Sequence, residues 1–201
     1  MKLSNIIFTV FFFLSTLAVA QETQTEPMME ESAIQAYELS IGAGKAYPYI
    51  PQDFKDQSKQ GLDIDGGIGA ILKTGSMGYS SLYLSVGYNS FDANTEEILL
   101  SQNKNSNDWI AGGGSVKLWN FHLNYKGTFS TERTIAPYFL LGVGFNSFKK
   151  NDVTLWDIVA DTVTTIVGDS RSDFSWNIGA GIDVPLGDLF TVYLEGKYIL
   201  A

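Results

Sequence analysis

The sequence predicts an all-β fold, an up-and-down antiparallel β-barrel whose strands cross a membrane. Apolar and polar residues alternate with a period of two through most of the chain, and this period indicates strands because successive side chains of a strand point to opposite faces. The polar faces carry glycine, serine, asparagine and single charges in place of long solvated side chains. Long and short connections alternate strictly along the chain. These features are typical of a small barrel with an apolar, lipid-facing outside and a narrow polar inside.

The composition agrees with a membrane barrel and argues against several other classes of protein. Charged residues make up only 17% of the chain, aromatic residues make up 13%, and there are 20 glycines. The formal net charge of −9 argues against nucleic acid as a partner, because nucleic-acid binding requires a basic surface. Cysteine is absent, which excludes disulfide bonds and a lipid-modified cysteine.

The first 20 residues have the features of an export signal. Lys2 precedes an apolar run over residues 6–14, and Ala18-Val19-Ala20 forms a small-residue cleavage site. We expect cleavage here in preference to retention as a membrane anchor. Residues 21–35 are acidic and contain a proline, so we expect a disordered tether. The barrel is then expected to cover residues 36–201.

Seven strands are expected in this region, and the clearest pattern covers residues 174–200. There, Trp176 and Ile178 share an apolar face, whereas Asn177 and Gly179 lie on the opposite face. We expect long connections at residues 47–60, 92–108 and 149–172, and short turns at residues 73–78, 130–135 and 185–189. The glycines at 112–114 suggest a bulge or the end of a loop, and we expect no turn that divides residues 109–129. The expected strands cover about residues 36–47, 61–72, 81–89, 115–129, 136–148, 174–184 and 190–200.

Aromatic residues lie near many strand ends. They are placed either as girdles at the two membrane interfaces or as ordinary barrel packing, and the pattern alone leaves both interpretations open. These residues are Tyr47, Tyr79, Tyr138, Phe148, Phe174 and Phe190.

Residues 135–145, IAPYFLLGVGF, resemble the "PY-x-x-x-G-x-G" strand of small bacterial outer-membrane barrels of the OmpA/OmpX/opacity type. Residues 178–183 and 194–198 are similar to the sixth and seventh strands of that family. The resemblance implies an eight-stranded barrel in the lipid bilayer of the cell outer membrane, inserted by the barrel-assembly machinery. The chain departs from the family at Ala201, where we count seven strands. Either the last strand is missing from this chain or this count is one strand short, and we favour the missing strand.

The polar faces of the expected strands carry a group of ionisable residues. Inside a narrow barrel such charges must be paired, because burying an isolated charge is costly. We expect a polar network that plugs the lumen, although some of these residues would face water if they lie at the rims. The group consists of Glu38, Asp63, Asp65, His122, Lys126, Asp183, Glu195 and Lys197.

No catalytic or metal-binding pattern stands out. His122 is the only histidine, and a catalytic triad would also need a marked nucleophile and an orienting carboxylate. Asp63 and Asp65 alternate on a strand and do not form an oxygen cage for a metal. The glycines at 112–114 lack the lysine of a phosphate-binding loop. We therefore expect no enzyme activity, no cofactor and no metal.

The connection over residues 149–172 is the best candidate for contact with an extracellular partner. Residues 153–159 and 162–167 have high β-propensity and are too apolar for a plain loop. We expect a hairpin that extends beyond the bilayer and offers a strand edge, or a short helix over residues 155–161; a hairpin that merely caps the barrel is the simpler interpretation. The candidate contact residues are Leu155, Trp156, Ile158 and Ile166.

Together these patterns predict a non-enzymatic outer-membrane barrel with a structural or surface-interaction role. One alternative is a small porin-like channel, which requires mobile or unpaired charges in the lumen. Another is a soluble exported lipid-binding barrel, in which the apolar face would point inward. The glycines and acids of the polar face and the scarcity of lysine argue against that inverted arrangement.

Overall fold

The computed structural model describes residues 6–11, 15–19, 34–50, 52–72, 78–129, 135–186 and 190–200. The three short turns and the tether predicted from the sequence lie largely outside these residues. Ile34 and Gln35, which were assigned to the tether, belong to the first long strand.

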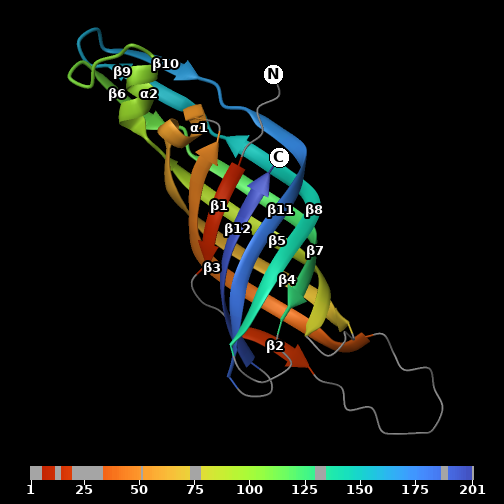
Figure 1. Cartoon of the computed structure of the whole chain (residues 1–201). Coiled ribbons are helices and arrows are strands. Elements are labelled where there is room, and N and C mark those ends of the chain that lie inside the picture. Colours follow the sequence, from red (N-terminus) through yellow and green to blue (C-terminus); the bar gives the residue numbers. More distant parts are fainter. Residues whose placement is uncertain are drawn as a thin grey trace, which may run out of the picture.

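Seven long antiparallel strands form the barrel wall (Figure 1). Each strand pairs with the one before it in the wall, so that the predicted up-and-down fold and the count of seven strands are confirmed. The wall strands are β3 (Ile34–Ile50), β4 (Ser58–Leu72), β5 (Tyr79–Ala93), β7 (Val116–Thr128), β8 (Ala136–Lys150), β11 (Ser170–Pro185) and β12 (Phe190–Leu200).

The polar faces of these strands point into the barrel and the apolar faces point outward. Asn124 and Asn177 are 2% and 1% exposed, whereas Leu84 and Trp176 on the alternate positions are 60% and 50% exposed. The alternative of a soluble barrel with an apolar interior is therefore wrong. An apolar outside is the arrangement that a bilayer requires.

Two short strands lie between the two edges of the seven-stranded wall. Both β1 (Ile6–Phe11) and β2 (Ser15–Val19) pair antiparallel with β12 and with β3. Their residues belong to the segment that the sequence predicts to be an export signal, and its cleavage stays a prediction. In this chain, β1 and β2 therefore occupy the position between β3 and β12 and pair with both of these strands.

Two of the long connections contain helices, which the sequence pattern did not predict. These are α1 (Gln52–Gln57) and α2 (Thr95–Ser101). Helix α2 carries Glu96 and Glu97 in its first turn, where negative charge interacts favourably with the helix dipole. Its Ile98 and Leu99 are buried, and their burial stabilises a helix too short to persist alone.

A second sheet stands at the end of the barrel that carries the long connections (Figure 1). It consists of β6 (Trp109–Gly113), β9 (Val153–Asp157) and β10 (Thr162–Ile166), in the order β10-β9-β6. The predicted hairpin forms as β9 and β10, which continue the register of β8 and β11 beyond the wall, and β9 also pairs with β6. The alternative helix over residues 155–161 was wrong. We call α2 with these three strands the cap.

Gly113 and Gly114 lie at a break between β6 and β7, where the chain continues in the same direction. Both glycines have positive φ, 78° and 75°, a conformation that glycine adopts without steric cost. The pairing of β6 with β9 keeps the register of β7 on β8, so no reversing turn divides residues 109–129, as the sequence predicts. Beyond this break β6 pairs with β9, and a small apolar core is formed by Ile98, Leu99, Val153 and Leu155.

An apolar layer fills the barrel beneath the cap. It contains Ala46, Phe91, Val116, Leu118 and Ile199, and Phe148 packs against it. Among the aromatic residues at strand ends, Phe174 faces outward, whereas Tyr138 and Phe148 point into the barrel. A girdle role for Tyr138 and Phe148 is therefore wrong, and Phe190 lies outside the side chains that the structure describes.

Substitution of Gly114 by alanine should destabilise the cap without affecting the barrel. The left-handed conformation costs a residue with a Cβ atom about 1–2 kcal/mol, and this Cβ would lie 2.8 Å from Cγ2 of Val153. Hydrogen exchange should accelerate in β9 and α2 but not in β4. Gly112→Ala is the matched control, since a Cβ at Gly112 meets nothing within 4 Å. Equal acceleration in both variants would contradict this account of Gly114.

Candidate functional site

The structure places all eight residues of the predicted lumen network on the inner face of the wall. Seven of them are buried and Asp65 is partly buried. Period-two alternation explains this placement, since each residue occupies an inward position of its strand. Glu38 comes from β3, Asp63 and Asp65 from β4, His122 and Lys126 from β7, Asp183 from β11, and Glu195 and Lys197 from β12.

Lys126 is the centre of a first ion cluster. Its Nζ lies 2.7 Å from Oδ2 of Asp183 and 3.9 Å from Oε1 of Glu38. The same Nζ lies 4.2 Å from the centroid of the Tyr138 ring, an arrangement in which the ring face attracts the cation. A hydrogen bond between two charged groups, as with Asp183, is among the stronger polar interactions in a protein.

Lys197 forms a second cluster with Asp65 and Glu195. Its Nζ lies 3.5 Å from Oδ2 of Asp65 and 3.7 Å from Oε1 of Glu195. The hydroxyl of Tyr138 donates a hydrogen bond of 2.9 Å to the other oxygen of Glu195. Tyr138 therefore joins the two clusters, with its ring against Lys126 and its hydroxyl on Glu195.

Among the described residues of this network, five carboxylates face two lysines, so negative groups outnumber positive ones. Oδ1 of Asp65 and Oδ1 of Asp183 are buried without a hydrogen-bond partner. The space left between the two clusters is a cavity of about 20 Å³, lined in part by Glu38, Tyr83 and Tyr193. Such a space holds about one water molecule.

A layer of amides and hydroxyls lies between the ion clusters and the apolar layer. Asn177 donates to Asn124 (2.9 Å), Asn124 donates to Ser85 (2.7 Å), and Asn120 donates to Asn89 (2.8 Å). Gly142 faces this layer, and a Cβ atom there would collide with the amides of Asn124 and Asn177. Gly142 is thus a position where neighbouring polar side chains occupy the space.

His122 lies beside a serine, which the sequence pattern did not single out. Its Nε2 is 2.9 Å from Oγ of Ser175, and this hydroxyl donates a hydrogen bond of 2.9 Å to Oδ1 of Asn146. Nε2 must then carry a proton and donate it to Ser175, so it is not arranged as a base. Ser175 is also fully buried. The pair has the geometry of a structural hydrogen-bond chain.

The described residues include no group of three or more side chains suited to hold a metal ion. They also include no helix with the length and hydropathy needed to cross a membrane.

The four surface residues predicted in the 149–172 connection divide into two pairs. Trp156 and Ile158 are 42% and 46% exposed, whereas Leu155 is buried and Ile166 packs against the cap core. The last two therefore hold the cap together and are not available to a partner. The sequence pattern also missed Ile110 and Val163, which are exposed and flank Trp156 across neighbouring strands.

Substitution of Tyr138 by phenylalanine should lower the free energy of unfolding by about 1–3 kcal/mol, because a buried carboxylate of Glu195 loses its donor. The measurement is denaturant unfolding of the chain in detergent or lipid. Tyr125→Phe is the matched control, since Tyr125 is 40% exposed on the outer face. If the two variants unfold alike, Tyr138 does not link the clusters energetically.

Comparison with known proteins agrees with this architecture. No curated protein matches the chain. A family model, described as the outer membrane protein beta-barrel domain, matches residues 6–201. This match covers the wall, the lumen network and the cap. The chain therefore belongs to the outer membrane protein beta-barrel domain family.

Proposed function

We propose that this protein is a non-enzymatic outer-membrane barrel whose lumen is sealed by its own side chains. The observation that carries the proposal is the filling of the lumen by three successive layers, which are charged, amide-rich and apolar. Between the ion clusters the remaining cavity is only about 20 Å³. Barrels of about eight strands are usually filled in this way, which leaves no continuous water path.

We also propose that the cap is the part that contacts an extracellular partner. Ile110, Trp156 and Val163 are adjacent across β6, β9 and β10 and are exposed on one face of the cap sheet. Among the described strands, β10 pairs with β9 alone. Its sequence TVTTI lacks the charge or proline that commonly protects a free strand edge. These features favour a partner that adds an extended strand to β10.

Delivery to the membrane follows the route of exported barrels in this proposal. The N-terminal segment would direct export and be cleaved after Ala20, and the barrel-assembly machinery would insert the strands. The alternation of an apolar outer face with a polar inner face supports this route.

A small channel is the second candidate, and the excess of carboxylates in the lumen favours it. Five acidic groups against two lysines would attract cations if the ion clusters opened. The two candidates differ in whether the apolar layer and the clusters stay closed under a membrane potential.

Planar-bilayer recording separates the sealed barrel from the channel. The purified full chain should insert without single-channel steps, because the apolar layer beneath the cap excludes ions. A large porin in the same bilayer serves as the positive control, and slower migration after boiling shows that the chain was folded. Reproducible cation-selective steps would reject the sealed lumen and support the channel.

Photo-crosslinking in intact cells tests the cap. A photoreactive residue at Val163, which is 64% exposed, should give a defined adduct with another protein. Thr165→Lys should abolish that adduct, since a lysine on a strand edge opposes strand addition. Leu100, exposed on α2, is the control position and should give none. Equal adducts from both positions, or no effect of the lysine, would contradict strand addition to β10.

A further inference from the structure

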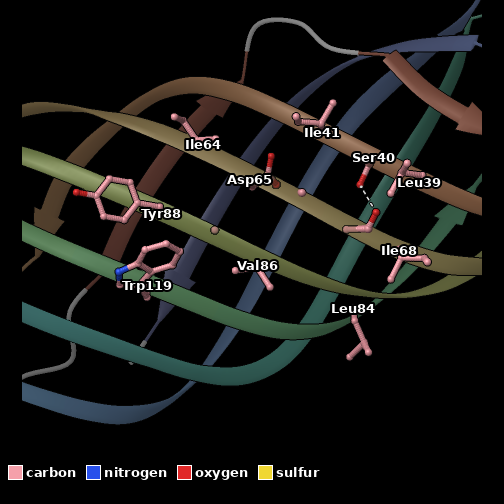
Figure 2. Close-up of a pocket in the computed structure, with 13 residues that line it drawn as sticks. Leu39, Ser40, Ile41, Ile64, Asp65, Ile68, Leu84, Val86, Tyr88 and Trp119 are labelled. Atoms are coloured by element: carbon pink, nitrogen blue, oxygen red, sulfur yellow. Dashed lines mark hydrogen bonds between the residues drawn. The ribbon is translucent and has the colours of Figure 1, made fainter.

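A hollow of about 1100 Å³ lies on the outer wall of the barrel, over β3, β4, β5 and β7. Figure 2 shows apolar side chains around it, among them Ile64, Ile68 and Val86, with Tyr88 and Trp119 side by side at one end. The rings of this aromatic pair lie 4.9 Å apart between centroids. The hollow is larger than the common size of small-molecule pockets, about 300–1,000 Å³.

Gly66 explains why the wall is hollow at this point. It occupies an outward position of β4, between Ile64 and Ile68 along the strand and between Ile41 and Val86 across it. A Cβ atom at Gly66 would come within 4 Å only of the Ser40 carbonyl oxygen, at 3.3 Å. Inward Gly142 leaves space that the amides of Asn124 and Asn177 fill, whereas the space over Gly66 stays open to the outside.

Exposed lysines lie just beyond the aromatic end of the hollow. The strand registers align Lys45, Leu62, Ser90 and Lys117 in one row across the same four strands, and Lys149 continues the row on β8. Lys45, Lys117 and Lys149 are all exposed. The whole chain has 13 basic residues against 22 acidic ones, so three lysines in one row form a local basic strip on an acidic protein.

The spacing of these features matches the cross-section of one membrane leaflet. Two residues along a strand span about 7 Å, so the lysine row lies about 7 Å from the Tyr88–Trp119 row and about 13 Å from Gly66. Tyrosine and tryptophan concentrate where headgroups meet hydrocarbon. The hollow therefore faces acyl chains and the lysine row faces headgroups.

We propose that this surface binds one anionic lipid of the surrounding membrane. Its acyl chain lies in the hollow over Gly66, and its phosphate-bearing headgroup lies between Lys45 and Lys117. The outer-membrane family of the chain places the hollow against lipid, and the basic strip selects negative charge among lipids. This proposal does not rest on a sealed lumen or on a partner of the cap.

Native mass spectrometry of the purified full chain tests this site. The detergent solution receives equal amounts of phosphatidylglycerol and phosphatidylcholine with identical oleoyl chains. We expect one retained phosphatidylglycerol, and a preference over phosphatidylcholine that falls about fivefold for each lysine replaced in Lys45→Gln and Lys117→Gln. Gly66→Leu should reduce retention of both lipids about tenfold, because its side chain displaces buried methylene groups.

Two matched variants act as controls. Ala180→Leu adds the same kind of side chain on the outer face of β11, away from the hollow. Lys104→Gln removes a lysine of the connection between α2 and β6, whose Nζ lies over the ring of Trp109. Both should retain lipid as the original chain does, and electrophoresis with and without boiling should show that all variants are folded. Equal retention by Gly66→Leu, an equal loss in Ala180→Leu, or a headgroup preference unchanged by the two glutamines would overturn the proposal.

Discussion

A charge inside a narrow barrel is stable only with a partner, and this requirement shapes the inner surface of the protein. Lys126 and Lys197 each hold two carboxylates. Tyr138 connects the two groups by a ring contact on one side and a hydrogen bond on the other. These side chains come from β3, β4, β7, β8, β11 and β12. The ion clusters therefore hold nearly all strands of the wall together and set its curvature. Breaking one pair would leave a buried charge, which costs more than the pair itself contributes.

Glycine serves two opposite purposes in the same wall. On the inner face, Gly142 makes room for the amides of Asn124 and Asn177, so that polar side chains can meet at the centre. On the outer face, Gly66 makes a hollow that no side chain of the described residues fills. The direction that a residue faces on its strand decides which of these results follows, and a one-residue shift in register would exchange them.

Period-two alternation carried most of the information about the wall. It predicted seven strands and which residues of β4 or β12 face inward, because side-chain direction in a strand depends on position alone. It could not predict that His122 meets Ser175, since that contact joins β7 to β11 across the lumen. It also missed the cap. Ile98 and Leu155 come from different connections and bury each other, and no local pattern in either segment reveals that packing. Tyr138 shares its face with Gly142, which was a signal that it points inward.

Because side chains fill the interior, this protein interacts through its outside. Two of its outer surfaces, the hollow and the cap, are physically connected. Strands β5 and β7 line the hollow, and the same two strands lead into α2 and β6 of the cap. The lysine row crosses both strands at Ser90 and Lys117, between the hollow and the cap. A lipid headgroup at this row would therefore lie directly below the cap, where it would restrain the ends of the strands that carry it. Lipid bound to the wall would thus stabilise the cap sheet with no change in the lumen.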